Sequence, residues 1–188
     1  MKFLFPLAFI ALMSCSSGPT NEERALASNA PHISTDQQEQ VDEKVEANEA
    51  KKASTPPKRH RVRMGDIPGE VQGFYNGTNL ERIEGELITE QGKEFDVYVY
   101  EAEKLIYSTH YQHFDSFAGK EGAFAIQQKL YYNNDVISQV ETRTGKPQNQ
   151  SLDHLEYALS YPDMDAVAEM YSARLAAYAR ALGQGRAQ

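Results

Sequence analysis

The chain has 188 residues, a mean hydropathy of −0.61 and a formal net charge of −8. This length accommodates one ordinary domain with additional segments, and the low hydropathy indicates that part of the chain lies outside the core. The acidic excess argues against a protein that coats nucleic acid, because neutralising phosphates requires a surplus of Lys and Arg. A single cysteine excludes an intrachain disulfide framework and a cysteine-rich zinc site.

The first residues have the pattern of a secretory signal peptide. Lys2 precedes an apolar run at residues 3–13 that is interrupted only by Pro6. As a helix this run would be about 16 Å long, whereas a bilayer core of about 30 Å requires roughly 20 residues. We therefore expect residues 1–14 to be a signal peptide and not a membrane-spanning helix.

The apolar run ends in Leu12-Met13-Ser14-Cys15. This tetrapeptide resembles the lipobox of bacterial lipoproteins. The resemblance implies that Cys15 receives a diacylglycerol, is acylated with palmitate and becomes the mature N-terminus, with the membrane as a partner through the lipid anchor. Ser16 in the next position implies a location in the bacterial cell envelope at the outer membrane, facing the periplasm. The alternative is an ordinary secretory signal with Cys15 as a free thiol.

Residues 15–66 are predicted to be a disordered tether. They are rich in charge, and their few large apolar residues, among them Ile33, Val41 and Val45, suggest no continuous face. The segment ends in a basic cluster, Lys58 to Arg63. This cluster is interpreted as a solvated junction that docks on the acidic domain, with contact to anionic headgroups as the alternative.

Residues 67–188 are predicted to form one α+β domain. Alternating apolar residues and turn signals such as Asn76-Gly77 indicate an antiparallel meander of about six strands within residues 70–144. In three hairpins a tyrosine precedes an aliphatic residue by five positions: Tyr75 and Leu80, Tyr100 and Leu105, Tyr132 and Ile137. This layout loosely resembles hairpin repeats of the MORN kind, although the glycine pattern of that family is present only at Gly77.

The C-terminal part is predicted to be helical. Ser151 is a suitable N-cap for a short helix at residues 152–160, which Pro162 ends. Asp163 opens a longer helix to Leu182, whose apolar residues recur every three or four positions. We expect this apolar stripe to lie on one face of the sheet. The alternative is a docking helix for a partner or for a second copy in a self-assembling structural protein.

The sequence contains little that points to catalysis. His110, His113 and Asp115 are the best candidates for metal ligands or acid–base groups, but residues three apart on a strand point to opposite faces. No phosphate-binding loop or nucleophile elbow is present, so we expect no cofactor and no bound metal. A small hydrolase that uses carboxylates or the His110 region is the catalytic alternative.

Tyrosines are the candidate binding residues. Tyr98 and Tyr100 share one strand face, and Tyr131 points to the face opposite Phe124 on the strand at residues 123–132. If the C-terminal helix covers the opposite, valine-bearing face, these rings form an exposed surface suited to sugars or peptides; the alternative is that they pack inside. The expected function is a non-catalytic envelope module that binds a protein, a peptide or a glycan.

Overall fold

The computed structural model describes residues 33–117 and 120–184. The domain is α+β, as the sequence predicted, with one antiparallel sheet and two long helices. In chain order the elements are α2 (Thr35–Lys52), β1 (Lys58–Met64), β2 (Ile67–Asn76), β3 (Asn79–Thr89), β4 (Gly92–Glu101), β5 (Lys104–Phe117), β6 (Lys120–Asn133), β7 (Val136–Gly145), β8 (Ala158–Ser160) and α3 (Met164–Ala181).

The sheet is a meander in which the strand order equals the chain order, β1 to β8. Six strands correspond to the predicted ones, and β1 and β8 are added at the two edges. Tight turns join the inner strands. The turn between β6 and β7, for example, places Asn134 and Asp135 at positive φ (51° and 64°), a conformation that Asn and Asp adopt more readily than most residues.

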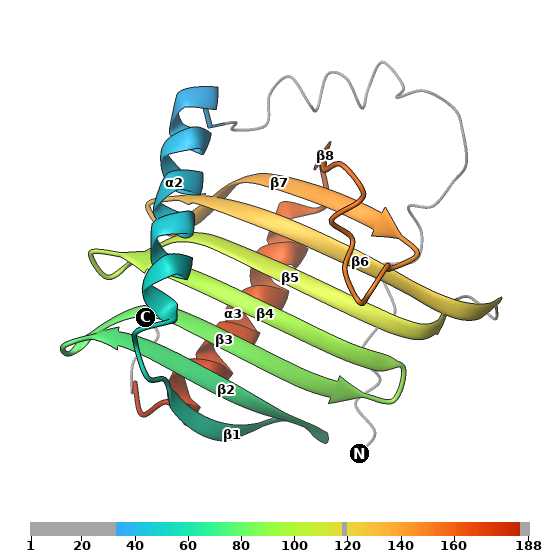
Figure 1. Ribbon diagram of the computed structural model, residues 1–188, viewed down its shortest axis with the longest axis horizontal. Helices are drawn as coiled ribbons and strands as arrows, with labels where there is room; N and C mark the ends of the chain where they lie inside the picture. Colours follow the sequence, from blue (N-terminus) through green and yellow to red (C-terminus); the bar gives the residue numbers. More distant parts are fainter. Residues whose placement is uncertain (1–32, 118–119, 185–188) are drawn as a thin grey trace. The chain divides into compact units, whose positions relative to one another are not determined.

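The tyrosine motif noted in three hairpins has a structural basis. In each hairpin the tyrosine pairs across the ladder with the aliphatic residue five positions later, directly after a shift in register. The shift leaves one extra residue in the second strand, namely Glu81, Ile106 and Ser138. Such bulges bend a strand and increase its twist. The three bulges lie at the same end of the sheet (Figure 1).

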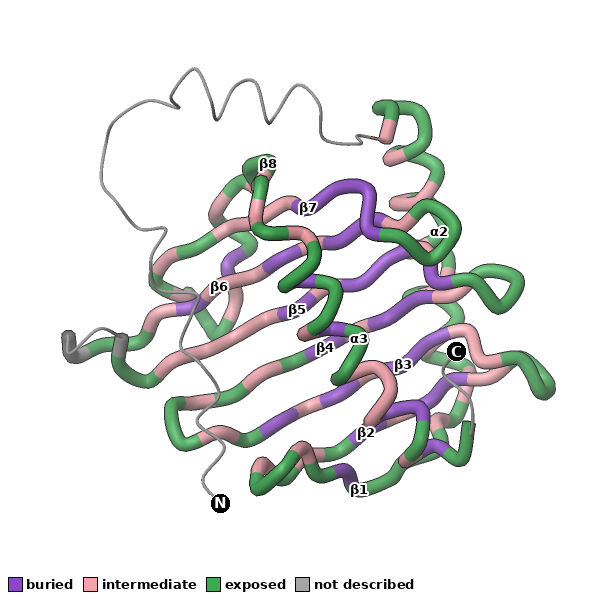
Figure 2. Tube along the Cα trace, turned by 180° about the vertical axis from the view of Figure 1, so that it is seen from behind, coloured by how far each residue is buried: buried purple, intermediate pink, exposed green. Residues whose placement is uncertain are grey.

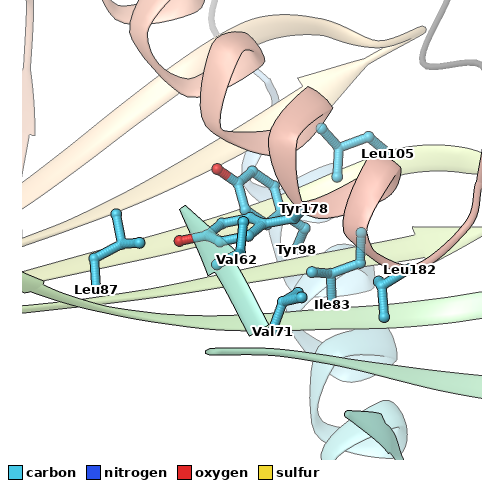
Figure 3. Close-up of a cluster of buried hydrophobic side chains, with 8 residues drawn as sticks. All are labelled: Val62, Val71, Ile83, Leu87, Tyr98, Leu105, Tyr178 and Leu182. Atoms are coloured by element: carbon cyan, nitrogen blue, oxygen red, sulfur yellow. The ribbon is translucent and has the colours of Figure 1, made fainter. Parts of the chain in front are cut away.

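Helix α3 lies across one face of the sheet, as predicted (Figure 2). The Asp163 side chain caps its first turn by accepting hydrogen bonds from the N–H groups of Asp165 and Ala166. Its apolar side packs on a core cluster that includes Tyr178 from the helix, its C-cap Leu182, and Ile83 and Tyr98 from the strands (Figure 3). The apolar stripe of α3 is thus used within the chain.

Helix α2 lies on the opposite face, near the bulged hairpin ends (Figure 1). It begins at a capping box in which Ser34 and Gln37 each bond the backbone N–H of the other. Together with β1 it occupies much of residues 33–66, so the prediction of a disordered tether over that part is wrong. The apolar residues there do share a face: Val41 and Val45 are four positions apart, and with Ile33 they pack on Val99, Tyr107 and Tyr131.

The predicted helix at residues 152–160 is also wrong. The structure has turns there, followed by strand β8, which pairs with β7. Ser151 accepts a hydrogen bond from the N–H of Asp153 without starting a helix. Tertiary contacts explain the difference, because Leu152 is fully buried and the Tyr157 ring lies against Lys129 and Arg143. Intrinsic helix propensity is too weak to oppose such contacts.

Two predictions fall outside the described residues: the signal peptide at residues 1–14 and the lipid attachment at Cys15. Of the helices in the described part, neither is long and apolar enough to cross a membrane.

Candidate functional site

A buried polar network lies between the sheet and α3. Asp96 on β4 and His110 on β5 are directly opposite each other, and His110 Nδ1 is 2.7 Å from Asp96 Oδ1. His110 Nε2 is 2.8 Å from the Ser108 hydroxyl, which is 3.0 Å from that of Tyr132. Asp96, Ser108 and His110 are each at most 1% exposed.

Helix α3 completes this network. The Tyr178 hydroxyl donates to Asp96 Oδ2 at 2.6 Å, and the Arg174 guanidinium lies 3.3 Å from Asp96 Oδ1 and also pairs with Glu94. The Tyr171 ring is stacked on His110 with ring centres 3.5 Å apart. The network therefore joins β4, β5 and α3 around the buried Asp96 carboxylate, while the Arg174 and Glu94 side chains remain 14% and 16% exposed.

Burial and hydrogen bonding set the protonation states of this network. Burial lowers the pKa of His110 and outweighs the opposing effect of Asp96, so the imidazole is neutral at pH 7. Burial alone would raise the pKa of Asp96, but the His110 hydrogen bond and the charge of Arg174 outweigh it and hold the pKa below its usual value. A neutral His110 then donates from Nδ1 to Asp96 and accepts at Nε2 from Ser108.

The order Ser108–His110–Asp96 is the same as in the triads of serine hydrolases, where His takes a proton from Ser and Asp orients the His. The environment is different. The Ser108 side chain lies under α3 with no exposed surface, so its oxygen is closed to a substrate in this structure. The arrangement is suited to fixing α3 on the sheet.

A second site is open. On the face that carries α2, a groove of about 630 Å³ lies over the ends of the strands that α2 leaves uncovered. Its apolar part includes Phe95 (38% exposed), Ile88 (53% exposed) and Tyr111. Phe95 and Tyr111 are neighbours across β4 and β5, with ring centres 6.1 Å apart. The Tyr111 hydroxyl has no hydrogen-bond partner within the described residues.

Polar side chains surround these rings. Lys93, His113, Asp115 and Gln127 come from the strands and their ends, and Gln150, Ser151 and Asp153 come from the segment between β7 and β8. The groove thus combines an apolar floor with polar side chains that donate or accept hydrogen bonds. These side chains include both basic and acidic groups.

Arg143 holds the outer wall of this groove. Its guanidinium donates to Gln127 Oε1 at 2.7 Å and to the Leu155 carbonyl at 3.2 Å, and it pairs with Asp153 at 2.6 Å. The Tyr157 ring also lies over it, at 4.4 Å. One side chain on β7 therefore holds residues 153–157 of the segment that lies over the sheet between β7 and β8 (Figure 1).

The predicted metal ligands do not converge. His110 faces α3, whereas His113 lines the groove on the other face, as the alternation of a strand requires. His113 Nε2 is 3.6 Å from Asp115 Oδ1. Over the described residues, no group of three or more His, Cys, Asp or Glu side chains is placed to hold a metal ion.

The predicted tyrosine surface is not free. Tyr98 is fully buried under α3, and Tyr100 packs at the edge of the same cluster. Tyr131 is fully buried on the opposite face, where its hydroxyl donates to Asp42 of α2. Tyr98 is a core residue because α3 covers its face of the sheet and not, as was expected, the face that carries Val97 and Val99. Tyr131 is a core residue because α2, which the sequence did not reveal, covers the other face.

Sequence reasoning missed the residues that matter most in both sites. Asp96 alternates with Phe95 and Val97 and so shares a face with Tyr98, while Tyr171, Arg174 and Tyr178 are three and four positions apart on α3. These spacings place the Asp96 carboxylate and the Arg174 guanidinium on surfaces that face each other. That placement was the only indication of the buried network in the sequence. Phe95 was visible in the strand pattern, but nothing in the sequence showed that its face stays partly open.

Comparisons with protein family models, with curated proteins and with solved structures found no match for this chain.

Proposed function

We propose that this chain is a non-catalytic binding module that holds a glycan segment in the groove beside α2. The observation that carries the proposal is a pair of neighbouring rings, the exposed Phe95 and the half-buried Tyr111, within a groove of about 630 Å³. Small-molecule sites in proteins usually measure about 300–1,000 Å³ and combine apolar walls with a few polar groups.

The chemistry of the groove favours a sugar. A sugar ring has an apolar face that packs on an aromatic ring and a rim of hydroxyls that both donate and accept hydrogen bonds. Phe95 and Tyr111 offer the rings, Gln127 offers an amide, and Asp153 and Lys93 offer charged groups at the rim. Lys93 and Asp153 are already paired with Glu86 and Arg143, so the net charge of the rim is small.

The test is calorimetric titration of the chain with a panel of neutral hexose and N-acetylhexosamine trisaccharides, with a panel of tripeptides alongside. We expect binding of at least one trisaccharide and a loss of about tenfold or more in affinity for Phe95→Ala, because the apolar face of a sugar would cover this ring and full burial of a Phe side chain is worth about 1.5–3 kcal/mol. Val136→Ala is the matched control, since Val136 is an exposed apolar residue at the start of β7. Binding of peptides alone, or an equal loss for both variants, would contradict the proposal.

We further propose that the module is lipid-anchored in the bacterial cell envelope, at the outer membrane, through Cys15. The support is the lipobox-like sequence before Cys15 and the charged segment that follows it. Two or more acyl chains hold a protein durably on a membrane. Labelled palmitate should enter the chain in a bacterial host and should not enter Cys15→Ala. Equal labelling of both proteins would disprove the anchor and would leave the groove proposal untouched.

A further inference from the structure

Strand β1 forms one edge of the sheet and is strongly basic. It pairs only with β2, and its seven residues include Lys58, Arg59, Arg61 and Arg63 with no carboxylate. These four cationic side chains are exposed. The whole chain has the opposite balance, with 19 Lys and Arg against 27 Asp and Glu.

The alternation of the strand sorts these cations by face. Val62 is buried in the cluster under α3, so Arg59, Arg61 and Arg63 point to the other side of the sheet. Residues two apart on a strand are separated by about 7 Å, and three of them form a straight row of about 13 Å. An arginine row of this kind presents several guanidinium groups to one flat partner at once.

Arg59, Arg61 and Arg63 are not neutralised by their own domain. Among the described residues, none of them has a carboxylate within 4 Å, although Glu70 lies opposite Arg61 across the ladder. By contrast, Lys52 and Arg82 near α2 are each paired with glutamates. The expected docking of the basic cluster on the acidic domain is therefore not seen at these arginines.

We infer that the β1 edge is a docking surface for an anionic membrane, and that its arginines bind the phosphates of lipid headgroups. Guanidinium groups bind phosphate with two parallel hydrogen bonds, which a flat array of headgroups can offer to each arginine in the row. Acidic residues more than about 8 Å away are largely screened at physiological salt and do not prevent this contact. Glu70 lies closer, opposite Arg61, but forms no ion pair with it. The surface would lie on the membrane that carries the proposed lipid anchor, and in that respect the inference rests on the proposed location.

The chain between the anchor and the domain is long enough for this contact. Nineteen residues separate Cys15 from Thr35, the first residue of α2, and an extended chain spans up to about 3.5 Å per residue. The maximum span of a chain of this length exceeds the length of α2, after which β1 begins. An anchored domain can therefore turn its basic edge toward the bilayer.

The test uses the chain from Pro31 to Gln188, which forms one compact unit and carries neither the apolar N-terminal run nor Cys15. It is sedimented with vesicles of phosphatidylglycerol and phosphatidylcholine in equal parts, and with phosphatidylcholine vesicles. We expect binding to the anionic vesicles only. Arg59→Gln/Arg61→Gln/Arg63→Gln should weaken binding about a hundredfold, since each basic residue near an anionic surface is worth about a fivefold change. Ionic strength near 1 M, where the Debye length is about 3 Å, should abolish binding.

The matched control is Lys44→Gln/Lys104→Gln/Lys146→Gln, which removes the same charge from α2, from β5 and from the segment after β7. We expect it to bind like the unchanged chain. Equal weakening in both variants, or absence of binding to anionic vesicles, would overturn the inference; the row would then serve only to protect a sheet edge from pairing. Because no lipid is attached to this protein, its failure to bind vesicles is separate from a failure of palmitate labelling at Cys15.

Discussion

The two helices of this domain cover opposite faces of one sheet and are held there by different forces. Helix α3 buries four residues, and its Arg174 and Tyr178 bond a carboxylate that has almost no contact with water. Helix α2 buries none. It touches the sheet through a small apolar patch around Val41 and Val45 and through exposed pairs such as Lys44 with Glu101.

This difference has consequences for both stability and function. Buried charges with complete partners are costly to disturb, whereas an exposed ion pair contributes about 0–1 kcal/mol and is screened by salt. The face under α3 is therefore expected to be a rigid base. The face under α2 is half covered, and the part that remains open is the groove.

The largest expected effect concerns the carboxylate under α3. Asp96→Asn removes the charge that balances Arg174 and weakens the acceptor for His110 and Tyr178. Breaking a buried pair in this way costs about 3–5 kcal/mol in the free energy of unfolding, to be measured by urea titration. Asp153→Asn is the control, because Asp153 pairs with Arg143 but is 82% exposed, and we expect it to cost no more than about 1 kcal/mol. Similar losses for the two variants would mean that α3 is not fixed by this network.

The next effect is a dependence of stability on pH. The folded state lowers the pKa of His110 below its usual value of 6.5, so unfolding below that value is accompanied by uptake of a proton. Stability is therefore highest above pH 6.5 and falls with decreasing pH, by up to about 1.4 kcal/mol per pH unit for this residue. The lowered pKa of Asp96 contributes a further loss as the pH falls below 3.8.

The check is urea titration at several pH values between 7 and 5. The His110→Gln variant is expected to be less stable at pH 7 and to show a flatter profile over this window. If its slope equals that of the unchanged chain, another group controls the acid sensitivity and His110 is not the buried neutral base that the geometry indicates.

The smallest expected effect concerns α2. Val41→Ser/Val45→Ser removes much of the apolar contact of this helix with Val99, Tyr107 and Tyr131, and we expect faster amide hydrogen exchange in α2 with little change in α3. Raising the salt concentration should produce the same selective change, because it screens pairs such as Lys44 with Glu101. Val136→Ser serves as the control for surface substitution. Equal acceleration in both helices would show that they unfold together and are not held differently.

The sequence was most informative where one strong periodicity dominated. Alternation identified the six central strands, and the apolar stripe from Met164 to Leu182 identified α3 and its role. The repeated spacing of Tyr75, Tyr100 and Tyr132 also has a structural basis, since each of these residues forms the first pair after a bulge. These features depend on the burial of apolar side chains, which produces a periodic pattern of apolar residues in the sequence.

It was least informative where polar contacts decide the structure. Helix α2 has only Val41 and Val45 as an apolar pair, and its remaining contacts are ion pairs and amide hydrogen bonds that no pattern distinguishes from a solvated segment. Because α2 was not predicted from the sequence, the sheet face that carries Tyr131 was expected to be exposed. In the structure α2 covers it. In the same way, residues 152–157 are placed by Arg143, ten or so residues earlier, which local helix propensity does not reveal.

Mapping where a ligand binds tests directly the proposal that the uncovered half of the α2 face is the binding surface. In a nuclear magnetic resonance titration with the tightest trisaccharide from the panel, we predict that the shifted amide signals cluster at Phe95, Tyr111, His113 and the segment 146–157. Signals of α3 and of the residues around Asp96 should remain in place. Shifts centred on α3, or spread evenly over the domain, would contradict the account.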